Sequence, residues 1–173
     1  MRVLGIGWIA VVWLLLLSGC TQQPQQVRRL NSSQTADSAL LAQMEFNMQM
    51  ASAADKLCSD WVKNDSVAYA MDEFGFWYAK TINQHADTLQ KGEKVLTHIQ
   101  IRELNGILLA DIKDYFTVGS SDLPIALQRC LRQMALDEEM RIVSPWYTAY
   151  GAEGTTLIKP YSNLIITLTT IKE

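Results

Sequence analysis

The residues of this sequence that could do chemistry are few, and one tyrosine stands out. Tyr150 opens a short loop in which Gly151 and Gly154 follow it, and the last apolar segment of the chain comes directly afterwards. A tyrosine hydroxyl can donate a hydrogen bond to a bound carbonyl, and glycines adopt turn conformations that few other residues tolerate. Alternatively, the hydroxyl could bond a neighbouring backbone carbonyl and only hold the loop. From the residues alone, both interpretations stay open.

Acid–base and metal chemistry find little support elsewhere in the chain. Asp137, Glu138 and Glu139 form an acidic run, but such a run at a helix-to-strand turn is usually a solvated face. His85 and His98 are isolated in the sequence. We therefore expect no metal site, no cofactor and no acid–base pair.

The first cysteine is expected to carry a lipid. Residues 6–17 are apolar throughout, which is shorter than the roughly 20 residues of a membrane-spanning helix, so residues 1–19 are predicted to be a signal peptide. Leu17-Ser18-Gly19-Cys20 resembles a bacterial lipobox, which implies cleavage before Cys20 and acylation of its sulfur. The alternative is a plain signal peptide with an incidental cysteine. Thr21 stands where an inner-membrane retention signal typically has Asp, so we expect a lipid-anchored protein of the cell envelope, at the outer membrane and facing the periplasm.

The remaining composition indicates one compact domain with an appendage. Cleavage would remove one basic residue and leave 14 Lys and Arg against 18 Asp and Glu, a net charge of −4, so nucleic acid is not an expected partner. Cys58 and Cys130 fit no zinc spacing. They are expected either to form a disulfide or to be two buried thiols.

The first half of the mature chain is expected to be a tether followed by a helix. Residues 20–35 are polar and Gln-rich, as in flexible linkers, and residues 36–66 are predicted to form an N-terminal helix. Its apolar stripe is Leu40, Met44, Met48, Ala51, Ala54, Cys58 and Trp61. We expect this stripe to pack on its own domain, although a Met-rich face could also bind peptides or a second copy.

The second half is predicted to be β-rich, with one internal helix. Strands are expected over residues 74–82, 94–104, 107–112, 114–119, 139–146 and 163–171, with a turn at residues 90–93. Asn105-Gly106 is a strong hairpin signal. Leu123, Leu127, Leu131 and Met134 recur at helical spacing, with Pro124 in the first turn. This pattern predicts an α+β fold, with an antiparallel sheet wrapped around one amphipathic helix.

The order of these elements resembles the FKBP family of peptidyl-prolyl cis-trans isomerases. The resemblance rests on Phe116-Thr117-Val118-Gly119, on the helix that ends at Met134, on the loop from Ala149 to Gly154, and on Ile158-Lys159-Pro160 with Leu164 after it. It implies an FKBP-like domain over residues 74–173, preceded by an N-terminal helix. The lipobox, tether and helix also resemble lipid-anchored FKBP-like proteins of the Bacteroidetes type.

The resemblance assigns the expected catalytic residues. Tyr150 matches the tyrosine whose hydroxyl binds the carbonyl of an X-Pro peptide, and Ile158 matches a residue that walls the pocket. Leu127 matches the pocket-floor tryptophan of the family.

The resemblance also assigns a set of substrate-binding positions, at several of which this chain departs from the family. The set is Ile99, Leu109, Leu123, Pro124 and Ile166. Ile99 and Ile166 stand where the family has tyrosine and phenylalanine, and Leu109-Ala110 replaces a Phe-Asp pair. Pro124 replaces an isoleucine whose backbone N–H binds the ligand, and proline has no N–H to donate.

Three functions are therefore considered. The first is an FKBP-type isomerase, of weak activity, that acts on proline-containing polypeptides and assists the folding of envelope proteins. The second is an inactive FKBP-fold lipoprotein that binds clients as a chaperone, and the third is a structural envelope lipoprotein that uses the fold as a spacer. Catalysis of this kind needs no nucleophile, metal or cofactor, only an apolar cavity and a hydrogen-bond donor.

The lipobox generates the first testable prediction. Cys20→Ala should abolish membrane fractionation, because no thiol would be left at the cleavage site to be acylated, while the folded domain should be unaffected. The measurement is partitioning between detergent and aqueous phases, with the unsubstituted chain as control. Unchanged partitioning of the variant into the detergent phase would contradict a lipid on Cys20.

Overall fold

The computed structural model describes residues 32–80 and 88–172 of the chain. The predicted signal peptide, Cys20, most of the tether, the end of the first predicted β segment and His85 lie outside these residues. The chain divides into two units, with the boundary between Leu41 and Ala42. Among the described residues, no helix is both long and apolar enough to cross a bilayer.

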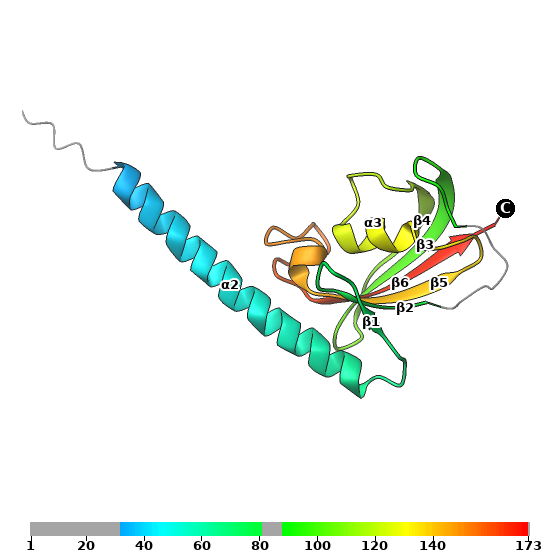
Figure 1. The fold of residues 1–173 in the computed structure, drawn as a ribbon, viewed down its shortest axis with the longest axis horizontal. Coiled ribbons are helices and arrows are strands. Elements are labelled where there is room, and N and C mark those ends of the chain that lie inside the picture. The colour runs from blue at the N-terminus through cyan, green and yellow to red at the C-terminus, as the bar shows by residue number, and fades with distance from the viewer. Residues whose placement is uncertain (1–31, 81–87, 173) are drawn as a thin grey trace, which may run out of the picture. The chain divides into compact units, whose positions relative to one another are not determined.

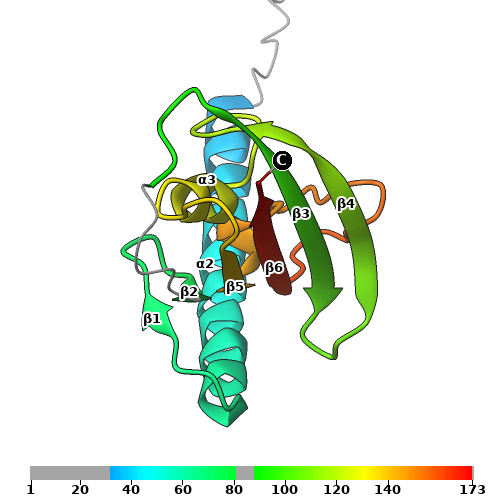
Figure 2. The same cartoon turned by 90° about the vertical axis from the view of Figure 1, so that its right-hand side faces the viewer.

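The second unit is built on one antiparallel sheet of six strands, in the order β1-β2-β5-β6-β3-β4 (Figure 1). The strands are β1 (Ala70–Met71), β2 (Trp77–Lys80), β3 (Lys94–Glu103), β4 (Leu108–Thr117), β5 (Glu139–Ser144) and β6 (Leu164–Ile171). The short helix α3 (Ile125–Leu131) lies on one face of the sheet (Figure 2). The predicted α+β fold, with an antiparallel sheet around one amphipathic helix, is thus confirmed.

Strand alternation decides which side chains face α3. In β3 the buried residues recur at every second position from Val95 to Ile101, which is the period of a strand with one buried face. Ile101 pairs with Ile166 on β6, which pairs with Ile142 on β5. Because directly opposite residues of an antiparallel pair share a face, these side chains and their neighbours two positions away form one apolar layer against α3.

The hairpin after β3 forms where Asn105-Gly106 predicts it. Gly106 has φ +89°, and its N–H donates to the carbonyl of Glu103 at 2.9 Å. The returning segment, which the sequence predicts as two strands over residues 107–112 and 114–119, is one continuous strand, β4. Lys113 does not interrupt it, because the ladder with β3 runs without a break from Ala110 to Thr117.

The first predicted β segment is partly a turn. Of residues 74–82, only Trp77–Lys80 lie in β2 among those described. Gly75, with φ +90°, closes a turn in which its N–H donates to the carbonyl of Asp72 at 3.0 Å. This turn connects β2 to β1, a two-residue strand that the sequence did not predict.

The N-terminal helix α2 spans Ser32–Asn64, so it begins four residues before the predicted boundary. The predicted apolar stripe is only half correct. Ala54 and Cys58 are buried, as expected, whereas Leu40, Met44 and Met48 are exposed. The prediction that the whole stripe packs on its own domain is therefore wrong for its first half.

The end of α2 contacts the sheet face opposite α3. The indole N–H of Trp61 donates to the carbonyl of Leu104 at 3.0 Å, and the guanidinium of Arg141 lies 5.7 Å from the Trp61 ring centroid. Arg141 also pairs with Asp65 at 3.1 Å, just beyond the helix. Because Arg141 alternates with Ile142, its side chain points away from α3.

Glu138 corrects the expectation that residues 137–139 are a solvated run. Its side chain is only 1% exposed and lies 2.8 Å from the ammonium of Lys80. It also accepts a hydrogen bond of 2.6 Å from the N–H of Ala135, and its own N–H donates to the hydroxyl of Thr170 at 3.1 Å. Glu138 thus connects the segment after α3 to β2 and to the end of β6.

This arrangement predicts that substitutions of two adjacent glutamates differ in their effect on the free energy of unfolding. Glu138→Ala should lower the free energy of unfolding by about 2–3 kcal/mol, because it leaves the buried N–H of Ala135 without an acceptor. It also removes the carboxylate beside Lys80, whose ammonium is partly exposed and keeps its hydrogen bond to the carbonyl of Gln133. Glu139→Ala, at an exposed position, should change it by about 0.5 kcal/mol or less. Equilibrium denaturation with urea measures both. Equal effects of the two substitutions would show that the Glu138 pair is not part of the stable core.

Candidate functional site

The structure brings seven of the eight predicted site residues into one apolar cluster. Ile99, Leu127, Ile158 and Ile166 are buried members of this cluster, and Leu109, Leu123 and Tyr150 are partly buried against it. They come from β3, β4, β6, α3 and the loops before α3 and β6. The remaining residue, Pro124, caps the start of α3.

Burial separates these residues into a closed floor and an accessible rim. The exposed fractions of Ile99, Leu127, Ile158 and Ile166 lie between 0% and 3%, so their side chains are closed off from solvent. A peptide could reach only the partly buried members. Besides Leu109, Leu123 and Tyr150, the partly buried residues that pack on the cluster are Tyr78, Phe116, Leu136 and Ala149. We use the term rim for Leu109, Leu123 and Tyr150 together with Phe116 and Ala149, which belong to the motifs of the family resemblance.

Phe116 and Ala149 are additions to the site that the sequence predictions did not make. Both belong to motifs that carry the family resemblance, but neither was assigned a binding role. The signal for Phe116 is its register, because it pairs with Val95, whose side chain is buried on the face that packs against α3. Alternation along β3 therefore predicts on which face Phe116 lies.

A β-bulge places Leu109 at the rim. Ile101 pairs with Ala110 and Arg102 pairs with Leu108, so Leu109 is an extra residue without a cross-strand partner. A bulge of this kind locally re-aims side chains. As a result Leu109 and Ala110, although adjacent in sequence, both pack toward the core.

Tyr150 packs partly buried against the cluster, and its hydroxyl differs from those of other tyrosines in the described part of the chain. The structure records no hydrogen-bond partner for it among the described residues, whereas the hydroxyls of Tyr69, Tyr147 and Tyr161 donate to Asp65, Asp55 and Asn47 respectively. Burial raises the pKa of the Tyr150 phenol above its ordinary value. The group therefore stays protonated at neutral pH and can act as a donor.

The loop after Tyr150 is closed by Gly154. Its N–H donates to the carbonyl of Tyr150 at 3.1 Å, and the N–H of Thr155 donates to the carbonyl of Ile158 at 2.7 Å. Gly151 and Gly154 both have positive φ, at +72° and +67°. This confirms that the two glycines supply turn conformations in the tyrosine loop.

Pro124 sits where the family resemblance expects a backbone donor. It precedes α3 with φ −52° and ψ 148°, and its carbonyl accepts the N–H of Gln128 at 3.0 Å. Proline has no N–H, so the hydrogen bond that the family forms at this position is absent here. Among the side chains of the eight predicted site residues, the Tyr150 hydroxyl is therefore the group that can donate a hydrogen bond to a substrate.

Neither Cys58 nor Cys130 is suited to act as a nucleophile. Cys58 and Cys130 are both free and buried, so of the two alternatives the structure has the buried thiols. Burial raises the pKa of the Cys58 thiol to about 12, and it also raises that of Cys130. Among residues 32–80 and 88–172, no group of three His, Cys, Asp or Glu side chains could hold a metal ion.

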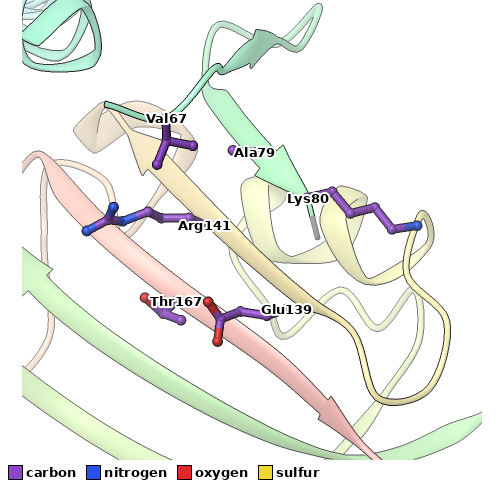
Figure 3. Close-up of a pocket in the computed structure, with 6 residues that line it drawn as sticks. All are labelled: Val67, Ala79, Lys80, Glu139, Arg141 and Thr167. Atoms are coloured by element: carbon purple, nitrogen blue, oxygen red, sulfur yellow. The ribbon is translucent and has the colours of Figure 1, made fainter. Parts of the chain in front are cut away.

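A separate depression of about 400 Å³ is lined largely by the sheet face opposite α3 (Figure 3). Its lining is mostly polar: Val67, Ala79, Lys80, Glu139, Arg141 and Thr167. None of these residues belongs to the predicted site, and Arg141 and Lys80 already pair with Asp65 and Glu138. The depression is therefore not part of the Tyr150 site.

Comparison with known proteins identifies the fold. A peptidyl-prolyl cis-trans isomerase from Pseudomonas syringae pv. tomato is similar in structure over 72% of this chain and 93% of its own, with a TM-score of 0.59 and 19% sequence identity. AtFKBP13 is similar over 61% of this chain and 98% of its own, with a TM-score of 0.55 and 17% identity. No protein-family model and no curated protein sequence matches the chain.

The chain therefore has the fold of FKBP-type peptidyl-prolyl isomerases. The FKBP-like fold predicted from the sequence is confirmed. At these identities the likeness concerns the fold, and the chemistry has to be argued from the residues of this chain.

The loop geometry predicts unequal effects of two similar substitutions. An alanine Cβ at position 154 would lie 2.2 Å from the carbonyl oxygen of Ile158, whereas at position 151 it would meet nothing within 4 Å. Both variants bear the cost of a positive φ, about 1–2 kcal/mol. Gly154→Ala should therefore be less stable than Gly151→Ala by a further 1–3 kcal/mol or so. Thermal unfolding of the two variants measures the difference, and equal stabilities would contradict the close approach.

Proposed function

We propose that this chain is a lipid-anchored peptidyl-prolyl cis-trans isomerase that acts on proline-containing polypeptides at the rim around Tyr150. The observation that carries the proposal is the Tyr150 hydroxyl, which is protonated and without a partner among the described residues, on a side chain that packs partly buried against an apolar cluster. The fold supports the same conclusion. The anchor at Cys20, a position at the periplasmic side of the outer membrane and a role in the folding of envelope proteins complete the proposal.

The reaction needs an environment more than a reactive group. Rotation about an X-Pro bond is opposed by amide resonance and takes roughly 10–100 s without a catalyst. The twisted amide has lost that resonance and much of its dipole, so an apolar surface disfavours it less than it disfavours the planar form. A hydroxyl that binds the carbonyl fixes the orientation of the amide as it twists.

Four of the five rim residues have a direct role in this scheme. The proline ring would lie against the apolar side chains of Leu109, Leu123 and Phe116, and the Tyr150 hydroxyl would donate to the carbonyl of the residue before proline. Leu127, Ile99 and Ile166 would support this surface from below. They are aliphatic where the family has aromatic residues, and an aromatic pair is worth roughly 0.5–1.5 kcal/mol beyond its buried area, so we expect weak activity.

A second function, client binding without catalysis, is favoured by two observations. Pro124 provides no N–H, and the floor residues are only 0–3% exposed, so Leu127 and Ile166 offer a proline ring almost no accessible surface. A chaperone would bind proline-containing segments at the same rim without accelerating their isomerisation. Peptide binding without rate acceleration would therefore favour this second function.

The test is a prolyl-isomerisation assay on the chain that begins at residue 21, with several X-Pro peptides. Tyr150→Phe should lower kcat/KM about 3- to 10-fold, because it removes one hydrogen bond worth about 1 kcal/mol. The rate should be constant between about pH 6 and 9, since no other side chain of the predicted site titrates. An uncatalysed rate in the folded wild-type chain would contradict the proposal.

The matched control is Tyr115→Phe. Tyr115 undergoes the same chemical change, but it is half-exposed and pairs with Leu96, whose side chain points away from α3. Its substitution should leave kcat/KM unchanged. A loss as large as that of Tyr150→Phe would show that the assay responds to general destabilisation and not to the hydroxyl at the rim.

A further inference from the structure

Two aromatic residues hold the backbone of the loop next to Tyr150. The carbonyl of Trp146 accepts the N–H of Gly151 at 2.9 Å, and the N–H of Tyr161 donates to the carbonyl of Gly151 at 3.2 Å. The residue directly after Tyr150 is therefore fixed by both hydrogen-bonding groups of its backbone. Its position depends on where Trp146 and Tyr161 lie.

Trp146 contacts Tyr147 and Tyr161, and both of these tyrosines contact α2. The ring centroids of Trp146 and Tyr161 are 4.8 Å apart, and those of Trp146 and Tyr147 are 5.7 Å apart. The Tyr161 hydroxyl donates to Asn47 at 3.0 Å, and its ring meets the ring of Phe46 edge-on at 5.6 Å. The Tyr147 hydroxyl donates to Asp55.

The two α2 residues that form these hydrogen bonds lie on one side of the helix. Asn47 and Asp55 are eight residues apart, which is about 12 Å along one face of a helix. Ala54 and Cys58, on the same side, are buried. This half of α2 therefore faces the loops that follow β5, while Met44 and Met48 remain exposed.

Tyr147 has little freedom to move. Besides Asp55, its hydroxyl lies 3.4 Å from the carbonyl oxygen of Gly75, and a Cβ on Gly75 would come within 2.7 Å of that hydroxyl. Burial and the Asp55 carboxylate both raise the pKa of Tyr147. The side chain is thus confined between α2 and the turn before β2.

Trp146, by contrast, is held by packing alone on its indole side. Its residue is 7% exposed, and its indole N–H is the one buried side-chain polar atom without a hydrogen-bond partner among the described residues. A ring without a directional bond takes its position from its neighbours. Here those neighbours include Tyr147 and Tyr161, both of which are bound to α2.

We propose that α2 holds the loop that carries Tyr150 in position, an arrangement we call the brace. In the brace, Asp55 and Asn47 of α2 are positioning residues that act on Tyr150 through Tyr147, Tyr161 and Gly151. Its consequence for catalysis rests on the proposed isomerase function. The brace itself concerns the position of a tyrosine ring and can be measured without turnover. A helix outside the FKBP-like domain would thus determine how well the rim is organised.

The experiment follows Tyr150 by fluorine NMR in the full chain, held in detergent and labelled with fluorotyrosine. The resonance of Tyr150 is assigned by its loss in Tyr150→Phe. Asp55→Ala should shift and broaden this resonance and lower kcat/KM about fivefold, the effect of weakening one hydrogen bond at the rim. Asp55→Asn, which keeps an acceptor oxygen, should restore the wild-type signal and rate.

A control and a second variant distinguish a change in the position of Tyr150 from a general loss of stability. Asp60→Ala lies on the same helix, where Asp60 pairs with Lys63 at 3.6 Å, and it should leave the Tyr150 resonance unchanged. If Asp55→Ala does not fold, Tyr147→Phe, which removes only the hydroxyl, gives the same test. A Tyr150 resonance that stays at its wild-type position in a folded Asp55→Ala or Tyr147→Phe variant, whatever the change in Tm, would overturn the brace.

The two proposals fail in different ways. If the wild-type chain shows no isomerase activity but the Tyr150 resonance responds to Asp55→Ala and is rescued by Asp55→Asn, the brace stands and the isomerase function fails. If activity is present and falls with Tyr150→Phe, but the Tyr150 resonance does not change in Asp55→Ala, the isomerase function stands and the brace fails.

Discussion

The constraint on which this structure depends is the register of β5, β6 and β3 beneath α3. Ile142, Ile166 and Ile101 are directly paired across three strands, so their side chains point to one face. Leu127 and Leu131 of α3 complete the same layer and are almost fully buried. A slip of one residue in any of these strands would turn its apolar side chains to the opposite face, so the floor, the rim and the helix position all follow from this register.

The loop between β5 and β6 turns this layer into a candidate site. It leaves the sheet at Ser144 and returns at Leu164, and within it Tyr150 and Ile158 reach back to the core that the strands create. Glycine at position 154 allows the loop to close on itself. The same loop extends Tyr147 and Tyr161 toward α2, so the contacts of the helix and the presentation of Tyr150 belong to one continuous segment.

The sequence predicts the parts of this structure that depend on local pattern. The alternation of Val95, Thr97, Ile99 and Ile101 determines the buried face of β3, and Asn105-Gly106 determines the hairpin, because turn type and strand period are properties of neighbouring residues. The resemblance places Tyr150 correctly in a loop against the core. Burial of the floor was less predictable, since apolar residues there are compatible with either an open pocket or a closed one.

Features that depend on distant partners could not be predicted. The carboxylate of the buried Glu138 pairs with Lys80, which lies on a strand far earlier in the chain. Helical periodicity finds the stripe on α2 but does not say where its partner surface ends, which is why Met44 and Met48 are exposed. The bond between Tyr147 and Asp55 joins residues 92 positions apart, and no local pattern marks it.

The central claim, that the rim around Tyr150 binds prolyl peptides, is tested most directly by amide NMR during titration with an X-Pro peptide. Binding at the rim predicts that the resonances of Leu109, Leu123, Tyr150 and Gly151 move together and saturate at one affinity. The same titration in Tyr150→Phe should saturate at a higher peptide concentration. Shifts confined to the opposite sheet face, at Val67, Arg141 and Thr167, or no shifts at all, would contradict the account.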